Sequence, residues 1–87
     1  MSDVGEGRMS GWTVDWPPAV RHDMLALHRS SAKEMIGAIV RLAETGVGRV
    51  EVLGGGRYSL RVAGGVSFFD VDPGARRLRV LRSLATW

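Results

Sequence analysis

The chain has 87 residues, with twelve lysine and arginine residues, nine aspartate and glutamate residues, and a formal net charge of +3. A chain of this length forms one small domain that buries about 60–65% of its unfolded surface, so a functional site is expected to be open. The absence of cysteine excludes disulfides and thiolate metal sites. Because no apolar run approaches about 18 residues and no signal peptide is evident, we expect a cytoplasmic protein without a membrane segment or bound cofactor.

The first residues, MSDVGEGRMSG, combine glycine, serine and mixed charge with little apolar material. Such a segment cannot bury enough surface to fold, which predicts a disordered tail over residues 1–11 and a single domain over residues 12–87. Met9 is an alternative start to Met1. The next run, Trp12 to Trp16, alternates apolar and polar residues, which predicts a first strand.

A first helix is predicted from about residue 18 to residue 29. Pro17 and Pro18 end the preceding strand and suit the first turn of a helix, where proline loses no needed hydrogen-bond donor. Apolar residues then recur at helical spacing, namely Val20, Met24 and Leu27. His22 and His28 lie six positions apart in this segment, a spacing that does not form a chelating pair, so we expect them to be ordinary helix residues.

A second helix follows after about three residues, so that the two helices form a hairpin. Ser31 to Glu34 has the pattern of a capping box, and Gly46 is well placed to end the helix in a left-handed conformation. Gly37 weakens this helix by about 1 kcal/mol relative to alanine, and we expect close packing against the first helix to be the reason for it. The apolar stripe of the helix consists of Met35, Ile39 and Leu42.

Four short runs of alternating residues fill the segment from Arg49 to Arg82. Glycine-rich breaks separate them at Gly54–Gly56, Gly64–Gly65 and Asp72–Gly74, which is typical of an antiparallel meander. The element order is therefore β-α-α-β-β-β-β. We expect an α+β fold in which the helical hairpin packs on one face of a small antiparallel sheet.

The two faces of this sheet differ in chemistry. A two-residue turn in the central hairpin puts alternate residues on opposite faces, whichever of the two possible turns is used. The expected core face carries Tyr58, Leu60, Val62, Phe69 and Val71, and the other face carries Arg57, Ser59, Arg61, Val66, Phe68 and Asp70. Residues 57–82 hold six arginines against two aspartates, a local charge of +4, which predicts a surface for phosphate or carboxylate groups.

Several short motifs occur in a fixed order along the chain: Trp16-Pro17-Pro18, Arg41-Leu42-Ala43-Glu44, Tyr58-Ser59-Leu60-Arg61-Val62, Asp70-Val71-Asp72 and Arg79-Val80-Leu81-Arg82. In this order they resemble the RelE/ParE superfamily of toxins from type II toxin–antitoxin systems, over roughly Trp12 to Ser83. The resemblance implies a toxin that either cleaves messenger RNA on the ribosome or poisons DNA gyrase. It also implies neutralisation by a cognate antitoxin, whose helical segment wraps the toxin.

The same resemblance implies a degenerate catalytic set. Arg61 keeps a basic residue and is the catalytic candidate, but Val66 stands where the family usually has arginine. Leu84, Ala85 and Thr86 stand where a glycine, a histidine or lysine, and an arginine are usual. Each missing acid–base group typically costs about 10²–10⁴-fold in rate. The expected binding residues for RNA or an acidic partner are Arg57, Arg61, Arg77, Arg79, Arg82 and Phe68.

Three functional hypotheses follow. The first is a toxin that acts by binding the ribosome or gyrase through these arginines. The second is an RNA endonuclease with a rearranged site, in which Arg61 holds the phosphate and Tyr58 or a residue near the C-terminus is the acid. The third is a non-catalytic interaction module or small RNA-binding domain, in which Phe68 stacks on a base or anchors a protein partner.

Overall fold

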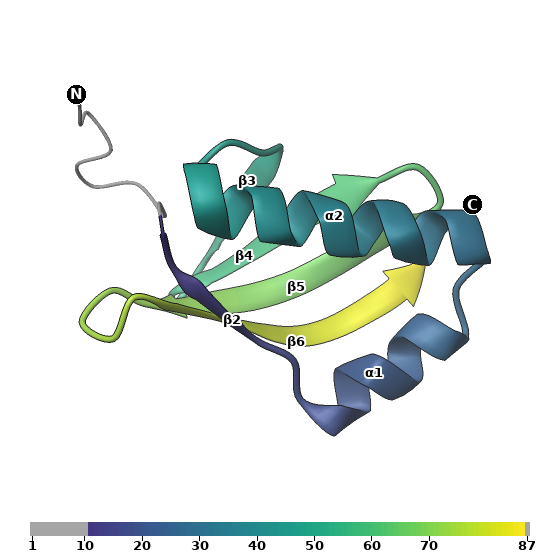
Figure 1. Cartoon of the computed structure of the whole chain (residues 1–87), viewed down its shortest axis with the longest axis horizontal. Coiled ribbons are helices and arrows are strands. Elements are labelled where there is room, and N and C mark those ends of the chain that lie inside the picture. Colours follow the sequence, from purple (N-terminus) through teal and green to yellow (C-terminus); the bar gives the residue numbers. More distant parts are fainter. Residues whose placement is uncertain (1–10, 87) are drawn as a thin grey trace.

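The computed structural model describes residues 11–86. Residues 1–10 and Trp87 lie outside the described residues. The predicted tail over residues 1–11 therefore falls outside them except for Gly11. The element order confirms the α+β class expected from the sequence (Figure 1). The elements are β2 (Thr13–Asp15), α1 (Pro18–Leu25), α2 (Arg29–Thr45), β3 (Val50–Gly54), β4 (Arg57–Val62), β5 (Gly65–Asp72) and β6 (Arg77–Ala85).

The strands form one sheet in the order β2-β6-β5-β4-β3. Strands β3 to β6 make the predicted antiparallel meander, whose central hairpin turns at Ala63 and Gly64 and pairs Val62 with Gly65. The sequence predicted an antiparallel sheet, whereas β2 joins β6 in parallel, with Val14 beside Leu78. The reason is that α1 and α2 carry the chain from β2 to the far edge of the sheet, where β3 lies. The next strands alternate in direction, and the last of them, β6, reaches β2 running in the same direction as β2.

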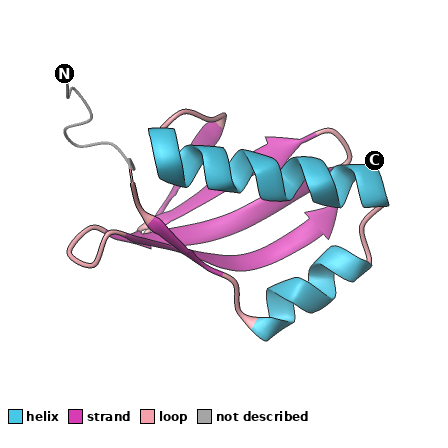
Figure 2. Cartoon of the chain, in the orientation of Figure 1, coloured by secondary structure: helices cyan, strands magenta, loops and turns pink. Residues whose placement is uncertain are grey.

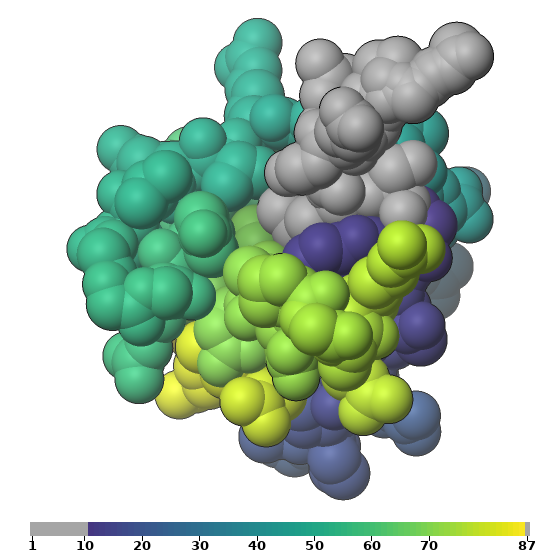
Figure 3. All heavy atoms as spheres, turned by 90° about the vertical axis from the view of Figure 1, so that its left-hand side faces the viewer, coloured from purple at the N-terminus to yellow at the C-terminus, as the bar shows by residue number. Residues whose placement is uncertain are grey.

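Helix α2 crosses one face of the sheet, and α1 lies beside the C-terminal half of β6 (Figures 1 and 2). Figure 3 shows the end of the molecule that lies at the left of Figure 1. At this end the β5–β6 turn lies next to β2, and the region around β3 lies on the other side of the β5–β6 turn. Neither helix is positioned over the second face of the sheet. The topology therefore leaves that face for a partner or substrate.

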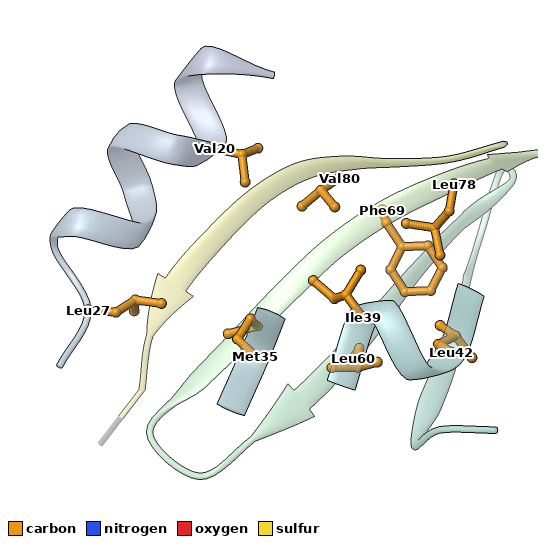
Figure 4. Close-up of a cluster of buried hydrophobic side chains, with 9 residues drawn as sticks. All are labelled: Val20, Leu27, Met35, Ile39, Leu42, Leu60, Phe69, Leu78 and Val80. Atoms are coloured by element: carbon orange, nitrogen blue, oxygen red, sulfur yellow. The ribbon is translucent and has the colours of Figure 1, made fainter. Parts of the chain in front are cut away.

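The hydrophobic core lies between α2 and the sheet, and α1 adds to one end of it (Figure 4). The predicted core face is confirmed, since Leu60 and Phe69 are buried and Tyr58 stacks on Phe69 with ring centroids 5.5 Å apart. The buried residues of this hydrophobic cluster are Val20, Leu27, Met35, Ile39, Leu42, Leu60, Phe69, Leu78 and Val80. Burial of these aliphatic and aromatic side chains is the main stabilising contribution in so small a domain.

The start of α2 differs from the prediction. The helix begins at Arg29, and its N-cap is His28, whose Nδ1 accepts a hydrogen bond from the backbone N–H of Ser30 at 3.3 Å. Ser31 does not act as the cap because its side chain is buried and its hydroxyl lies against the turn at Gly64. The earlier helix ends at Leu25, four residues before the predicted end, to make room for this cap.

The C-terminus of α2 agrees with the prediction, but its internal glycine does not. Gly46 has φ 75° and donates its N–H to the carbonyl of Leu42 at 2.8 Å. Gly37 was expected to pack against α1, yet a Cβ added there would meet no atom within 4 Å. Gly37 is exposed and opens onto a groove described below.

A β-bulge in β6 changes the faces of its last residues. Phe69 pairs with Val80, whereas the preceding Phe68 pairs with Arg82, so Leu81 has no partner in the ladder. The extra residue turns Arg82 to the same face as Phe68 and turns Ser83 to the core side. There the Ser83 hydroxyl meets that of Ser67 at 2.6 Å, and both are buried.

Candidate functional site

The sheet face opposite α2, here called the open face, holds every residue that the sequence predicted for binding. The register pairs Arg57 with Asp70, Arg61 with Val66 and Phe68 with Arg82, and directly paired residues project to the same side. The remaining members, Arg77 and Arg79, continue this side along β6. The structure thus brings Arg57, Arg61, Phe68, Arg77, Arg79 and Arg82 together on one surface.

This surface is less cationic than the sequence predicts. Asp70 accepts a hydrogen bond from Nη2 of Arg79 at 3.3 Å, and the parallel strand β2 places Asp15 beside the same arginine. Glu51 joins the face opposite Ser59, and Asp72 lies opposite Arg77. The charge count over residues 57–82 omits Asp15 and Glu51, which come from the two edge strands. The arginines of the open face are therefore interleaved with carboxylates.

Arg61 differs from the other arginines of the open face. Its direct neighbour on β5 is the buried Val66, whereas Arg57 and Arg77 lie opposite aspartates. Within residues 11–86 Arg61 has no ion pair or side-chain hydrogen bond. Its exposed guanidinium is therefore free for a phosphate or carboxylate group. Of the candidate residues, it is the one best placed to accept a new anionic partner.

Phe68 lies in the middle of the open face. It is half-buried between its ladder neighbours Ser59 and Arg82, and it is not the fully exposed side chain that the sequence suggested. Val66 and Leu84 pair beside it, and the side chain of Leu84 adds an exposed apolar edge. The open face therefore combines a small apolar centre with a charged surround.

Groups that exchange protons near neutral pH are missing from the open face. Among the described residues on this side of the sheet there is no histidine, lysine or tyrosine. Tyr58, the acid of the rearranged-nuclease hypothesis, points into the core side and stacks on Phe69. His28 caps α2, and His22 lies on α1.

Asp23 was not predicted as part of any site. Its Oδ2 accepts hydrogen bonds from Nε of Arg82 at 2.8 Å and from the backbone N–H of Ser83 at 3.0 Å. The bond from Arg82, with that from Ser83, holds the pKa of the Asp23 carboxyl below its ordinary value, although partial burial opposes this. Arg82 is therefore already engaged at the sheet edge, and no local sequence pattern links two residues so far apart in the chain.

A groove of about 1060 Å³ lies between α2 and the edge formed by β3 and the end of β4, and we call it the α2 groove. Lys33, Gly37 and Arg41 line its helical wall, and Arg49 and Arg61 line the strand side. The three helix residues follow each other at a spacing of four, which places them on one stripe of a helix. That spacing was visible in the sequence, but the facing wall comes from strands whose position was not.

Two further classes of function find no support in this part of the chain. Across residues 11–86 no group of three histidine, aspartate or glutamate side chains is arranged to hold a metal ion. None of the described helices is long and apolar enough to cross a membrane.

Comparison with known proteins gives structural similarity only. No model of a known protein family matches the chain, and no curated protein matches its sequence. A chain of the RelBE2 toxin–antitoxin complex from Mycobacterium tuberculosis superposes with a TM-score of 0.60 and 17% identity, over 91% of this chain and 95% of that one. The isolated RelE toxin of E. coli superposes with a TM-score of 0.70 and 11% identity, over 87% of this chain and 85% of that one.

Both superpositions cover most of either chain, so they concern the whole α+β architecture and not one supersecondary motif. The similarity agrees with the motif order from Trp16 to Arg82. The chain therefore has the fold of the RelE toxins.

Proposed function

We propose that this chain is the toxin of a type II toxin–antitoxin system and that it arrests its target by binding, without cleaving RNA. The fold supports the toxin class, because the similarity to RelE toxins extends over nearly the whole chain. The observation that carries the mechanism is the composition of the open face. It offers arginines for anionic groups, and its described residues include no histidine, lysine or tyrosine.

RNA cleavage by attack of the ribose 2′-hydroxyl needs a base for that hydroxyl, an acid for the leaving oxygen and cations around the phosphate. Arg61 meets the last need, but an arginine stays charged and makes a poor base. The carboxylates of the open face lie among arginines, and Asp70 is bonded to Arg79. Carboxylates beside the scissile phosphate also oppose its binding by like-charge repulsion.

Binding alone places weaker demands on the same surface. Arg57 and Arg61 offer planar guanidinium groups for bidentate contact with phosphate or carboxylate oxygens. Phe68 and Leu84 add an apolar centre to the surface. Such a face suits the ribosome or DNA gyrase, and translation and plasmid supercoiling measured after induction distinguish the two targets.

We further infer that a cognate antitoxin neutralises the chain through a helical segment, and that both act in the cytoplasm. The supporting observation is that one structural neighbour was solved as a toxin–antitoxin complex. A segment that folds into a helix on binding can cover a large surface. Its loss of conformational entropy then occurs in the binding step. The open face, with its half-buried Phe68, is the expected site of this cover.

Induced expression in growing cells tests the proposal. Growth is expected to stop when the chain is expressed alone and to recover when the adjacent short reading frame is co-expressed. The double variant Arg57→Ala and Arg79→Ala is expected to stay folded and lose the arrest, because both side chains are exposed on the open face. Arg21→Ala is the matched control, since Arg21 is exposed on α1.

Two results would reject parts of this proposal. Normal growth while the folded chain accumulates rejects a toxin. Arrest that the open-face variant retains in full rejects binding through this surface.

A further inference from the structure

The α2 groove carries an excess of positive charge. Lys33, Arg41, Arg49 and Arg61 line it together with the acidic residues Glu34 and Glu51. In the part of the chain that the structure describes, no salt bridge joins any of these six side chains to another group. The four cations outnumber the two carboxylates, so the groove attracts anionic groups.

The walls of the groove are partly apolar. Val47 is 57% exposed at the mouth, and Val50, Val62 and Ala38 are half-buried along the sides. An occupant must therefore present small apolar groups between its charges. A second copy of the chain does not fit this requirement well, because two chains of net charge +3 would bring like-charged grooves together.

Gly37 forms part of the helical wall of the groove. A Cβ at this position would meet no atom within 4 Å, so the missing side chain leaves open space and not a packing contact. A glycine in the interior of an exposed helix weakens that helix by about 1 kcal/mol. A larger side chain at position 37 would occupy part of the groove.

The strand side of the groove ends in an unpaired backbone edge. Pairing between β3 and β4 begins at Val50 and Leu60, but β4 continues through Arg61 and Val62, which have no strand partner on that side. Exposed strand edges pair readily with extended peptides, because the main chain supplies the hydrogen bonds. The groove thus has an edge for a peptide backbone next to cations for its side chains.

RNA is a poorer match for the same groove. Recognition of single-stranded nucleic acid relies on aromatic side chains that stack with the bases. None of the described residues that line the groove is aromatic. The apolar side chains along its walls are aliphatic, and these suit the aliphatic side chains of a peptide.

We propose that the α2 groove is a docking site for an extended acidic segment of a protein partner. Lys33, Arg41 and Arg61 bind its carboxylates, and its backbone lies along the free edge of β4. This site shares Arg61 with the open face, but Lys33 and Arg41 come from α2, and the proposal does not depend on the proposed function. Purified chain and synthetic peptides are sufficient to test it.

The test measures fluorescence anisotropy with a short labelled peptide of alternating glutamate and valine. The same peptide with lysine in place of glutamate, and a labelled single-stranded RNA of similar length, are the comparison probes. Lys33→Glu with Arg41→Glu should weaken binding of the acidic peptide by at least about tenfold, since two attractive contacts become repulsive. Arg21→Glu with Arg76→Glu is the matched control, because it makes the same change of charge at exposed positions outside the groove.

A second variant leaves the charge unchanged. Gly37→Leu places a side chain in the groove at a position where a Cβ meets no neighbour, so it should keep the fold and weaken the peptide as well. Amide hydrogen exchange in residues 61–63 should slow when the peptide is bound, because the free edge becomes paired. Circular dichroism of each variant confirms that it is folded.

Three outcomes would overturn the proposal. One is that the acidic peptide does not bind even at low salt. Another is that the groove variants and the control variant lose affinity equally, which would mean that only net charge matters. The third is that the RNA binds more tightly than the peptide and that Gly37→Leu weakens RNA binding, which would assign the groove to nucleic acid.

Discussion

The carboxylate of Asp23 on α1 binds the guanidinium of Arg82 on β6, with Oδ2 to Nε at 2.8 Å and Oδ1 to Nη2 at 3.4 Å. The same Oδ2 also accepts the backbone N–H of Ser83 at 3.0 Å, beyond the point where β2 pairs with β6. Asp23 therefore takes the place of a strand partner at this edge. Since Val20 is the only fully buried residue of α1, this polar contact is a principal attachment of the helix to the sheet.

Removing this contact should destabilise the domain. Asp23→Ala leaves the Ser83 N–H without its acceptor, and an unsatisfied backbone donor costs about 1–3 kcal/mol when it is shielded from water. Asp23→Asn keeps one oxygen that can accept from Ser83 and should cost less. Urea unfolding measures both, and an Asp23→Ala midpoint equal to that of the parent chain would show that α1 is held by its apolar contacts alone.

The same contact predicts a pH dependence. The pKa of Asp23 in the folded chain is lowered from the ordinary value of 3.8, chiefly by the bond from Arg82. A carboxyl group whose pKa is depressed on folding contributes stability above its ordinary pKa, and this contribution is lost as the pH falls through the folded pKa. The difference in unfolding free energy between the parent chain and Asp23→Asn should be constant near neutral pH and shrink below pH 3.8. A difference that instead shrinks between pH 6 and pH 8 would assign the effect to another group, such as a histidine.

The core assignment is tested by truncation. Leu60 and Ile39 face each other across the α2–sheet interface and are 1% and 0% exposed (Figure 4). Replacing either by alanine should cost about 2–5 kcal/mol, from lost transfer free energy and the cavity left behind. Chemical unfolding provides the measurement, and a loss below about 1 kcal/mol would contradict the packing described here.

Two glycines should respond in opposite directions to alanine. Gly37→Ala should stabilise by about 1 kcal/mol, because it improves helix propensity and its Cβ meets no neighbour. Gly64→Ala should destabilise by at least about 1 kcal/mol, because Gly64 has φ 82° and its Cβ would collide with the Ser31 hydroxyl. Thermal unfolding of the two variants gives the comparison, and a gain in stability at position 64 would refute the turn geometry.

Much of the sheet was predictable because alternation fixes faces once a turn is located. The parity of Tyr58, Leu60 and Phe69 placed them in the core, and that of Arg57 and Arg61 placed them on the other face. No pattern in the sequence indicates the bulge at Leu81, because an extra residue in one strand depends on how the whole ladder is packed. Without the bulge, Arg82 would point into the core side.

The charge of the open face and the N-cap of α2 were less predictable, because both depend on contacts between segments that are distant in the sequence. The charge count over residues 57–82 does not include Asp15 or Glu51, which reach the open face from edge strands. Ser31 to Glu34 fits a capping box locally, but the approach of the β4–β5 turn buries Ser31 and leaves the cap to His28. In both cases tertiary contacts between distant segments overrode a local pattern.

The most direct test of the central claim is whether the purified chain cuts messenger RNA on programmed ribosomes. Intact RNA is expected, because the described residues of the open face include no histidine, lysine or tyrosine to protonate the leaving oxygen. The double variant Val66→Arg and Leu84→His places a second cation and an imidazole on the open face, and it is the comparison in which cleavage is expected, if it occurs in either chain. Robust cleavage by the parent chain would contradict a mechanism of binding alone, and cleavage that persists in Arg61→Ala would also show that the site lies elsewhere.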